Sequence, residues 1–327
     1  MSSHTLHSPH SVPAPAPSAP RFWSRDLVSI RDLSSHEVQS VLHLAAVMKA
    51  RPEDFRGALA GKQMALFFEK PSLRTRLTFQ AGMASLGGVS FFMDQTASRL
   101  DARESLADIA RNLERWVDFI MARTNAHATL VELATHARVP VINGLSDLRH
   151  PCQVLSDCFT LTERRGRLEG LRVAWLGDGN NVANSWIAVA PRFGFAFALA
   201  CPRGYEPDPA TVNKARAEGA TIHLTEDPRA ALRDADVIYT DVWTSMGQEA
   251  EAARRQRDFL PYQVNGAALQ QAKPDAVVMH CLPAHRGEEI TGEVIDGPQS
   301  IVFDQAENRL HVQKGVLVWL NQQMGRH

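Results

Sequence analysis

The length, composition and charge of the chain exclude several classes of protein. Its 327 residues, 44% hydrophobic and 22% charged, are typical of a soluble globular protein with roughly two domains. The 35 Lys and Arg residues balance 36 Asp and Glu residues, and the formal net charge is −1. This balance argues against a nucleic-acid partner, because such domains are usually strongly basic. No apolar run reaches about 18 residues, so we expect no contact with a membrane.

Cysteine usage and the N-terminal tract indicate where the protein works. The four cysteines form no Cys-x-x-Cys pair and are too sparse for a disulfide scaffold, which favours a reducing, cytoplasmic location. Residues 1–20 are rich in Ser, His, Pro and Ala, and we expect a disordered extension. This tract lacks the apolar stretch of a secretory signal and has no arginine before Arg21, so we expect no targeting peptide.

The first half of the chain alternates short apolar runs with amphipathic segments. Ser34 and Glu37 have the spacing of a capping box and predict the start of a helix. Strands and helices then alternate as far as His150. The predicted strands span 64–68, 89–93, 117–122 and 139–142, and the predicted helices span 72–87, 105–116 and 126–137.

A second alternating series follows a long predicted helix over residues 151–165. Its strands are predicted at 172–176, 195–200, 221–224, 237–240, 276–280 and 300–303, and its last helix at 306–321. Such alternation is typical of parallel sheets covered on both faces. We therefore predict an α/β fold of two doubly wound parallel-sheet domains with the active site in the cleft between them. The first domain spans 21–150 and is completed by the C-terminal helix at 306–327, and the second spans 151–305.

Ligands of open α/β sheets bind beyond the carboxyl ends of the strands, where this chain places its polar clusters. The segment 72–76, Ser-Leu-Arg-Thr-Arg, opens a predicted helix and can cradle a phosphate, although solvated arginines at a helix start are an equal alternative. Arg123 follows a strand and can polarise a ligand oxygen, but a lone arginine there is more often a surface residue. His150 and Gln153 can reach a carbonyl or amide from one helix start, although a simple helix cap is the more common role.

The glycine-containing segment 177–181 first resembles a dinucleotide-binding turn. Val182 stands where the third glycine should be, and the next predicted strand ends in Cys201-Pro202-Arg203 without the acidic residue that holds a ribose. A dehydrogenase is therefore the weaker hypothesis, and we expect no cofactor. The paired asparagines instead offer amides for a carboxylate or amine ligand.

Two further strand ends carry chemically useful side chains. Asp241 can bind a ligand ammonium group, and the loop that follows it ends in Gly247 and can close over a ligand. Cys281 is either a nucleophile or, more commonly for such residues, a buried inert thiol. No Cys or His set has the spacing of metal ligands, so we predict no metal.

Six segments, taken in order, resemble the aspartate/ornithine carbamoyltransferase family. They are FEKPSLRTR (68–76), HPCQ (150–153), GDGNNV (177–182), DVWTSMGQ (241–248), HCLPAHRGEE (280–289) and AENRLH (306–311). The resemblance implies a first domain that binds carbamoyl phosphate, a second that binds ornithine, and a homotrimer with shared active sites. It also implies a role in arginine metabolism and leaves the biosynthetic or catabolic direction open.

The resemblance implies a role for each cluster. The carbamoyl-phosphate site would comprise Ser72, Leu73, Arg74, Thr75, Arg123, His150, Gln153 and Arg309. The ornithine site would comprise Asn181, Asp241, Ser245, Met246, Cys281 and Leu282. Of these, Arg123, His150, Cys281 and Arg309 would act in catalysis, with Cys281 positioning the amine rather than attacking.

Two positions depart from the family pattern. Leu73 replaces the usual threonine, so a backbone contact to phosphate would survive and a hydroxyl contact would not. Arg99 replaces a glutamine that the family supplies from the neighbouring subunit, and with Arg103 it would offer that subunit's phosphate two positive charges.

Several alternatives stay open at this point. An aspartate carbamoyltransferase would need a basic residue for a second substrate carboxylate, whereas Asp241 favours a diamino acid. Relatives acting on N-acylornithine or putrescine fit less well, because the first lacks the α-ammonium group and the second lacks a carboxylate for Asn181. A non-catalytic carbamoyltransferase-like protein is a different class, and the near-complete set of polar residues argues against it.

Overall fold

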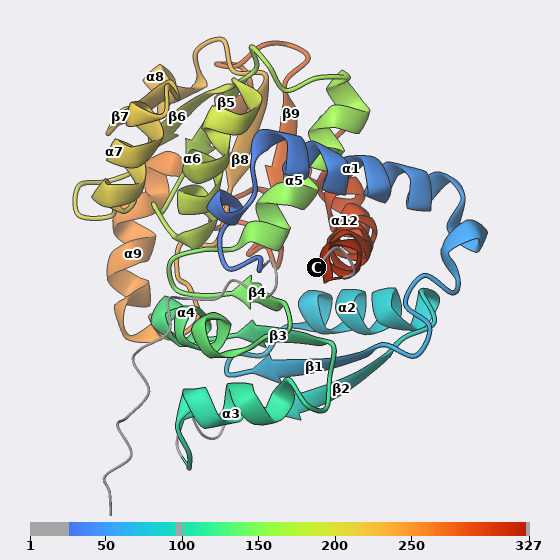
Figure 1. Ribbon diagram of the computed structural model, residues 1–327. Coiled ribbons are helices and arrows are strands. Elements are labelled where there is room, and N and C mark those ends of the chain that lie inside the picture. Colours follow the sequence, from blue (N-terminus) through green and yellow to red (C-terminus); the bar gives the residue numbers. More distant parts are fainter. Residues whose placement is uncertain (1–25, 96–99, 102, 325–327) are drawn as a thin grey trace, which may run out of the picture.

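Two parallel β-sheets with helices packed on their faces form the core of the computed structural model, which describes residues 26–95, 100–101 and 103–324 (Figure 1). The first sheet has the strand order β2-β1-β3-β4. Its strands are β1 (Gln63–Phe68), β2 (Val89–Asp94), β3 (Phe119–Arg123) and β4 (Val141–Leu145). The predicted fold class is confirmed.

The helices around the first sheet begin where the sequence predicts them. Ser34 caps α1 by accepting a hydrogen bond from the Glu37 N–H, and the Glu37 side chain accepts one from the Ser34 N–H, so the predicted capping box is confirmed. The helices in this part are α1 (Ser35–Ala50), α2 (Leu73–Ser85), α3 (Leu106–Leu113), α4 (His127–His136) and α5 (Pro151–Arg165), with short 3₁₀ turns η1 (Ile30–Asp32) and η2 (Pro52–Phe55).

The second sheet has the order β7-β6-β5-β8-β9 and is parallel throughout. Its strands are β5 (Arg172–Leu176), β6 (Ala196–Ala200), β7 (Ile222–Thr225), β8 (Val237–Thr240) and β9 (Val277–His280). The remaining elements are α6 (Asn181–Phe193), α7 (Pro209–Ala217), α8 (Pro228–Leu232), η3 (Glu249–Glu251), α9 (Ala252–Phe259), η4 (Leu260–Tyr262), α10 (Gly266–Leu269), α11 (Gly292–Ile295) and α12 (Val302–Met324).

One predicted strand is wrong. Residues 300–303 make a single bridge, in which Val278 donates to Gln299 and Ile301 donates to Val278, and the chain then enters α12 at Val302. The β-branched run has the composition of a strand, but Val302 is buried while Phe303 is 65% exposed. The buried positions continue at helical spacing from Val302 onward, so the tertiary packing of α12 overrides the local strand preference.

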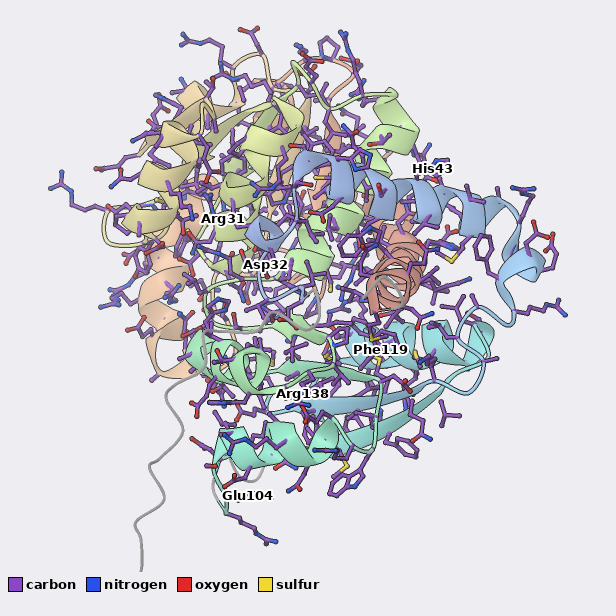
Figure 2. All side chains as sticks on the ribbon, viewed as in Figure 1. Arg31, Asp32, His43, Glu104, Phe119 and Arg138 are labelled. Carbon is purple, nitrogen blue, oxygen red and sulfur yellow. The ribbon has the colours of Figure 1, made fainter. Side chains whose placement is uncertain are left out.

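The C-terminal helix α12 lies between the two sheets and packs against α1, α2 and α5 (Figure 1). Its close approach to α1 depends on Gly315, where a Cβ atom would lie 2.7 Å from the Val41 carbonyl oxygen. Phe119, at the start of β3, is fully buried and lies on the side of its sheet that faces α2 and α12 (Figure 2). The last helix therefore shares a core with the first sheet.

Among the described helices, none is both long enough and apolar enough to cross a membrane.

Candidate active site

A cleft of about 520 Å³ lies where the carboxyl ends of both sheets meet. Strand register explains the convergence, because Phe68 pairs with Arg123 in the first sheet, and Thr240 pairs with both Leu176 and His280 in the second. The cleft is lined by the predicted residues Ser72, Leu73, Arg74, Thr75, Arg123, His150, Gln153, Asn181, Asp241, Ser245, Met246, Cys281, Leu282 and Arg309. Arg99 lies outside the described residues.

One wall of the cleft is cationic. Arg123, the last residue of β3, is 6% exposed, and Arg309 of α12 is 2% exposed. Burial, reinforced by the nearby Arg309 and Arg74, lowers the pKa of Arg123 to about 9. Among the described residues, the Nε atoms of Arg123 and Arg309 have no hydrogen-bond partner. This wall is therefore built to receive an anion.

His150 belongs to the same wall as a neutral group. It stands at the N-cap position of α5 without a capping hydrogen bond from its side chain, and its backbone N–H donates to the Ser185 hydroxyl at 2.8 Å. Burial lowers the pKa of the His150 imidazole well below its usual value, and the positive charges of Arg309, Arg123 and Arg74 lower it further. A neutral imidazole can donate one hydrogen bond to a ligand oxygen without carrying charge.

The N-terminus of α2 adds backbone donors to this wall. Ser72 caps the helix, and its hydroxyl oxygen accepts a hydrogen bond from the Thr75 N–H at 3.3 Å. The Thr75 hydroxyl accepts one from the Arg309 guanidinium at 3.1 Å. The Leu73 side chain is 71% exposed, so the residue that departs from the family pattern leaves the backbone N–H groups of this turn unchanged.

The opposite wall is acidic. Asp241 directly follows β8, and its Oδ1 atom accepts a hydrogen bond from the Cys281 thiol at 3.0 Å. Its Oδ2 atom accepts one from the Asn180 amide at 2.7 Å. Burial and the Asp241 carboxylate raise the pKa of the Cys281 thiol well above its usual value. Cys281 is thus a protonated hydrogen-bond donor rather than a thiolate nucleophile.

Asn181, by contrast, turns its side chain toward the first domain. Its amide donates to the Ser146 carbonyl oxygen at 2.6 Å, and Asn180 rather than Asn181 caps α6. Sequence reasoning singled out Asn181 and missed the role of Asn180. The signal was present in the Asn-Asn pair between a predicted strand and a helix, because asparagine is one of the residues preferred at a helix N-cap.

A buried pair supports the loop that carries Cys281. His280 and Glu289 are both fully buried, and the His280 Nε2 atom lies 3.0 Å from a Glu289 carboxylate oxygen. The Leu282 N–H donates to the other ring nitrogen at 2.9 Å, which leaves the proton on Nε2 to bond Glu289. The His285 N–H donates to the same carboxylate. Sequence reasoning missed Glu289, because only the fold brings it beneath His280.

The structure also brings together donor atoms that sequence spacing does not connect. Two groups within the described residues have ligand atoms less than 4.8 Å apart, namely Asp241-His280-Cys281 and His285-Glu288-Glu289. In the first group both ring nitrogens of His280 and both oxygens of Asp241 already have hydrogen-bond partners. We therefore assign that group to hydrogen bonding.

Further lining residues were not assigned to the site from the sequence. They are Lys70, Pro71, Leu145, Val182, Val242, Thr244, Pro283 and His285. Lys70 adds an amine to the cationic wall. Burial and the neighbouring Arg123 lower the pKa of this amine. Together the two walls can hold an anionic group against the arginines and an ammonium group against Asp241, with a reacting centre between them.

Comparison with known protein families defines the class. The chain matches the carbamoyl-phosphate-binding domain of aspartate/ornithine carbamoyltransferases over residues 25–163, and their Asp/Orn-binding domain over residues 169–320. The chain belongs to the aspartate/ornithine carbamoyltransferase family.

Within this family the similar proteins include ornithine carbamoyltransferases. The enzyme of Syntrophus aciditrophicus is 50% identical over 296 residues, which cover 90% of this chain and 98% of that relative. The enzyme of Thermus thermophilus is 51% identical over 297 residues, covering 90% and 96%. The solved ornithine carbamoyltransferase of Pyrococcus furiosus has a TM-score of 0.88 and 47% identity over 93% of this chain and 98% of that chain.

The protonated state of Cys281 leads to a prediction about its reactivity. At pH 8.5 iodoacetamide should alkylate Cys281 at least about tenfold more slowly than free cysteine, because only the thiolate reacts. Asp241→Asn removes the neighbouring charge that raises the thiol pKa and should accelerate alkylation of this residue. Peptide mass spectrometry would measure the rate, with buried Cys152 as the internal control. An unchanged rate in the variant would show that Asp241 does not hold the thiol protonated.

Proposed function

We propose that the cleft transfers the carbamoyl group of carbamoyl phosphate to the δ-amine of L-ornithine, giving L-citrulline and phosphate. This is the activity of an ornithine carbamoyltransferase (EC 2.1.3.3), the activity named for the relatives above. The observation that carries the proposal is the division of one cleft into a wall of buried cations around Arg123 and Arg309 and a wall centred on Asp241.

The reaction needs correct placement more than it needs a reactive protein group. Arg123, neutral His150 and the Thr75 hydroxyl donate hydrogen bonds to the carbamoyl oxygen as it gains negative charge. The neutral δ-amine attacks the carbamoyl carbon, a C–N bond forms, and the C–O bond to phosphate breaks. Phosphate leaves with that electron pair toward the N-terminus of α2 and Arg74, and the amine gives up one proton, which the departing phosphate oxygen accepts. Neither a metal nor a cofactor takes part.

On the other wall, ornithine is held by both of its α-groups. Asp241 pairs with the α-ammonium group. Asn181, whose amide has a second N–H besides the one bonded to Ser146, binds the α-carboxylate with Ser245 and Met246 beside it. The Cys281 thiol and the Leu282 carbonyl position the attacking amine. In this arrangement the thiol acts through a hydrogen bond, in agreement with its raised pKa.

An N-acylornithine substrate is the second candidate and fits less well. A solved N-acetyl-L-ornithine transcarbamylase resembles this chain with a TM-score of 0.80 and 30% identity, over 90% of this chain and 99% of that chain. Acylation would remove the positive charge that Asp241 is placed to bind, and would leave this buried carboxylate without a counter-charge. Asp241 therefore favours free ornithine.

The free cysteines agree with a reducing, cytoplasmic location.

We also propose a homotrimer in which neighbouring chains share active sites. The edge strand β2 exposes Val89, Phe91 and Met93, and α2 exposes Leu73 and Leu77 beside it. An unpaired apolar edge of this kind favours an interface. Because Leu73 also lines the cleft, this apolar surface continues into the site itself.

The segment that precedes α3 supports the sharing of sites. Arg103 does not line its own chain's cleft, and its neighbour in the sequence, Glu104, lies near the start of α3 (Figure 2). If Arg103 serves a phosphate site, that site belongs to a neighbouring chain, and we propose the same role for Arg99, which is close to it in the sequence. A closed ring of three chains would give every cleft one such segment.

An amine panel and one variant test the proposed reaction. The purified protein should form citrulline from carbamoyl phosphate and ornithine, and should not carbamoylate N-acetylornithine or putrescine at a comparable rate. Asp241→Asn should raise the KM for ornithine by about two orders of magnitude, because the ammonium group loses its buried partner. The KM for carbamoyl phosphate should stay nearly constant. Asp275→Asn, which alters an acid paired with Arg165 outside the cleft, is the matched control. Equal losses for both substrates would contradict the assignment of Asp241.

The pH dependence should follow the substrate amine and not His150. The attacking amine has a pKa near 10 and must lose a proton, so kcat/KM should rise about tenfold per pH unit between pH 7 and 9. The pKa of His150 is depressed, so the imidazole stays neutral over this whole range. His150→Gln should lower the rate and keep the slope. A plateau in the wild type that the variant lacks would show that His150 titrates in this range.

Mixed trimers test the shared site. A variant with Arg99→Ala and Arg103→Ala, and a second with His150→Ala, should each be nearly inactive alone. After co-refolding at equal amounts, about a quarter of sites combine an intact cleft with an intact neighbouring segment, and activity should recover to that fraction. Native mass spectrometry would establish that hybrid trimers form. Hybrid trimers without activity would mean that the segment serves its own chain or no site.

A further inference from the structure

A buried carboxylate lies directly behind the cleft and plays no part in the mechanism above. Asp157 is fully buried on α5, one turn after Gln153. Its Oδ1 atom accepts hydrogen bonds from the Gln153 amide at 2.8 Å and from the Gln305 amide at 2.7 Å. Its Oδ2 atom accepts one from the Tyr239 hydroxyl at 2.9 Å. Of these three partners, Gln153 lines the cleft, whereas Gln305 and Tyr239 do not.

The Gln153, Gln305 and Tyr239 side chains all donate hydrogen bonds to Asp157, so the side chain at this position must be an acceptor. The Gln305 NH₂ group also donates to the Tyr239 oxygen at 2.9 Å, so the tyrosine proton is directed to Asp157. Burial raises the pKa of Asp157 to about 6, against the lowering effects of its three hydrogen-bond donors and Arg309. The carboxylate therefore remains ionised at neutral and basic pH.

This arrangement fixes which end of the Gln153 amide enters the cleft. Because the NH₂ end donates to Asp157, the carbonyl oxygen points the other way, where it accepts a hydrogen bond from Arg309 at 2.5 Å. An amide oxygen has two acceptor positions, and Arg309 uses one. The second can accept an N–H from a ligand in the cleft.

We propose that Asp157 is a positioning residue that holds the Gln153 amide with its oxygen toward the substrate, so that the cleft selects a carbamoyl NH₂ group over a methyl group of the same size. The inference rests on the proposed function, because it assigns the carbamoyl group to the space beside Gln153. An acyl phosphate such as acetyl phosphate has no N–H to offer at this position. It would leave the Gln153 oxygen with one acceptor position unmatched.

The same cluster reaches the acidic wall. The Gln305 carbonyl oxygen accepts a hydrogen bond from the His280 N–H at 3.0 Å, and Cys281 follows His280 in the chain. Asp157 thus fixes Gln305 and Gln153 through one oxygen atom. Loss of that oxygen should disturb carbamoyl recognition first, because Gln153 lines the cleft and Gln305 does not.

Two stable ligands separate recognition of the carbamoyl group from recognition of phosphate. Phosphonoacetamide carries the NH₂ group, and acetonylphosphonate has a methyl group in its place. Isothermal titration calorimetry should show that the wild type prefers the amide by about tenfold, the value of one well-placed hydrogen bond. Asp157→Leu should weaken phosphonoacetamide about tenfold and change acetonylphosphonate by less than about twofold.

Conservative variants distinguish positioning from a structural role. Asp157→Asn is uncharged like the leucine variant but retains an oxygen for Gln153, and should keep the preference for the amide within about threefold. Tyr239→Phe removes a different bond to Asp157, leaves the Gln153 bond in place, and should also keep the preference. Thermal unfolding would report the stability of each variant. If Asp157→Leu weakened the binding of both ligands equally, or left the preference for phosphonoacetamide over acetonylphosphonate unchanged, the proposal would be overturned.

A charge exchange keeps the test decisive if Asp157→Leu does not fold. Gln153→Glu places two carboxylates together and should bind phosphonoacetamide poorly. Adding Asp157→Asn removes one of the two facing charges and should restore at least about fivefold of the affinity. No recovery would refute the coupling between the two positions. Citrulline formation by the wild type is measured separately, so a failed reaction would count against the proposed function, and a failed preference in an active enzyme only against this inference.

Discussion

The burial of several positive charges at the edge of one sheet is the constraint on which the rest of the site depends. Arg123 and Arg309 are almost fully buried and face each other without a paired carboxylate in contact among the described residues. Removing charged groups from water is costly, and their mutual repulsion adds to that cost. A phosphate-bearing ligand would remove both penalties at once, so binding of such an anion should also stabilise the folded state.

The opposed charges of the two walls leave the groups between them uncharged. On the cationic wall, the arginines and burial lower the pKa of His150 and keep its imidazole neutral. On the acidic wall, Asp241 and burial raise the pKa of Cys281 and keep its thiol protonated. The cleft therefore contains neither an activated nucleophile nor a strong general base at these positions. A reaction that needs only orientation and stabilisation of an oxyanion suits such a site.

The sequence predicted the elements whose signals are local. The long helix at 151–165 and the strands at 172–176 and 237–240 have the predicted bounds. The predicted strand at 300–303 failed because packing of the last helix decides the conformation there. Most cleft residues were found from motifs at strand ends, where topology brings them together. Asp157 and Glu289 could not be found in this way, because their roles depend on contacts between residues far apart in the sequence.

Two helices set the relation between the walls. On α12, Gln305 contacts the second sheet through Tyr239, and Arg309 contacts the first domain through Thr75. These positions are one helical turn apart, about 6 Å along the axis. On α5, Asp157 and Gln153 repeat the same spacing, and each bonds to its counterpart on α12. The two helices are thus joined by two hydrogen bonds. Gln305 and Asp157 form the one next to the second sheet, and Arg309 and Gln153 form the one at the cleft. Because α-helical rise is nearly fixed, the backbone geometry of these two helices sets the position of the cationic wall relative to the second sheet, which ends at the acidic wall.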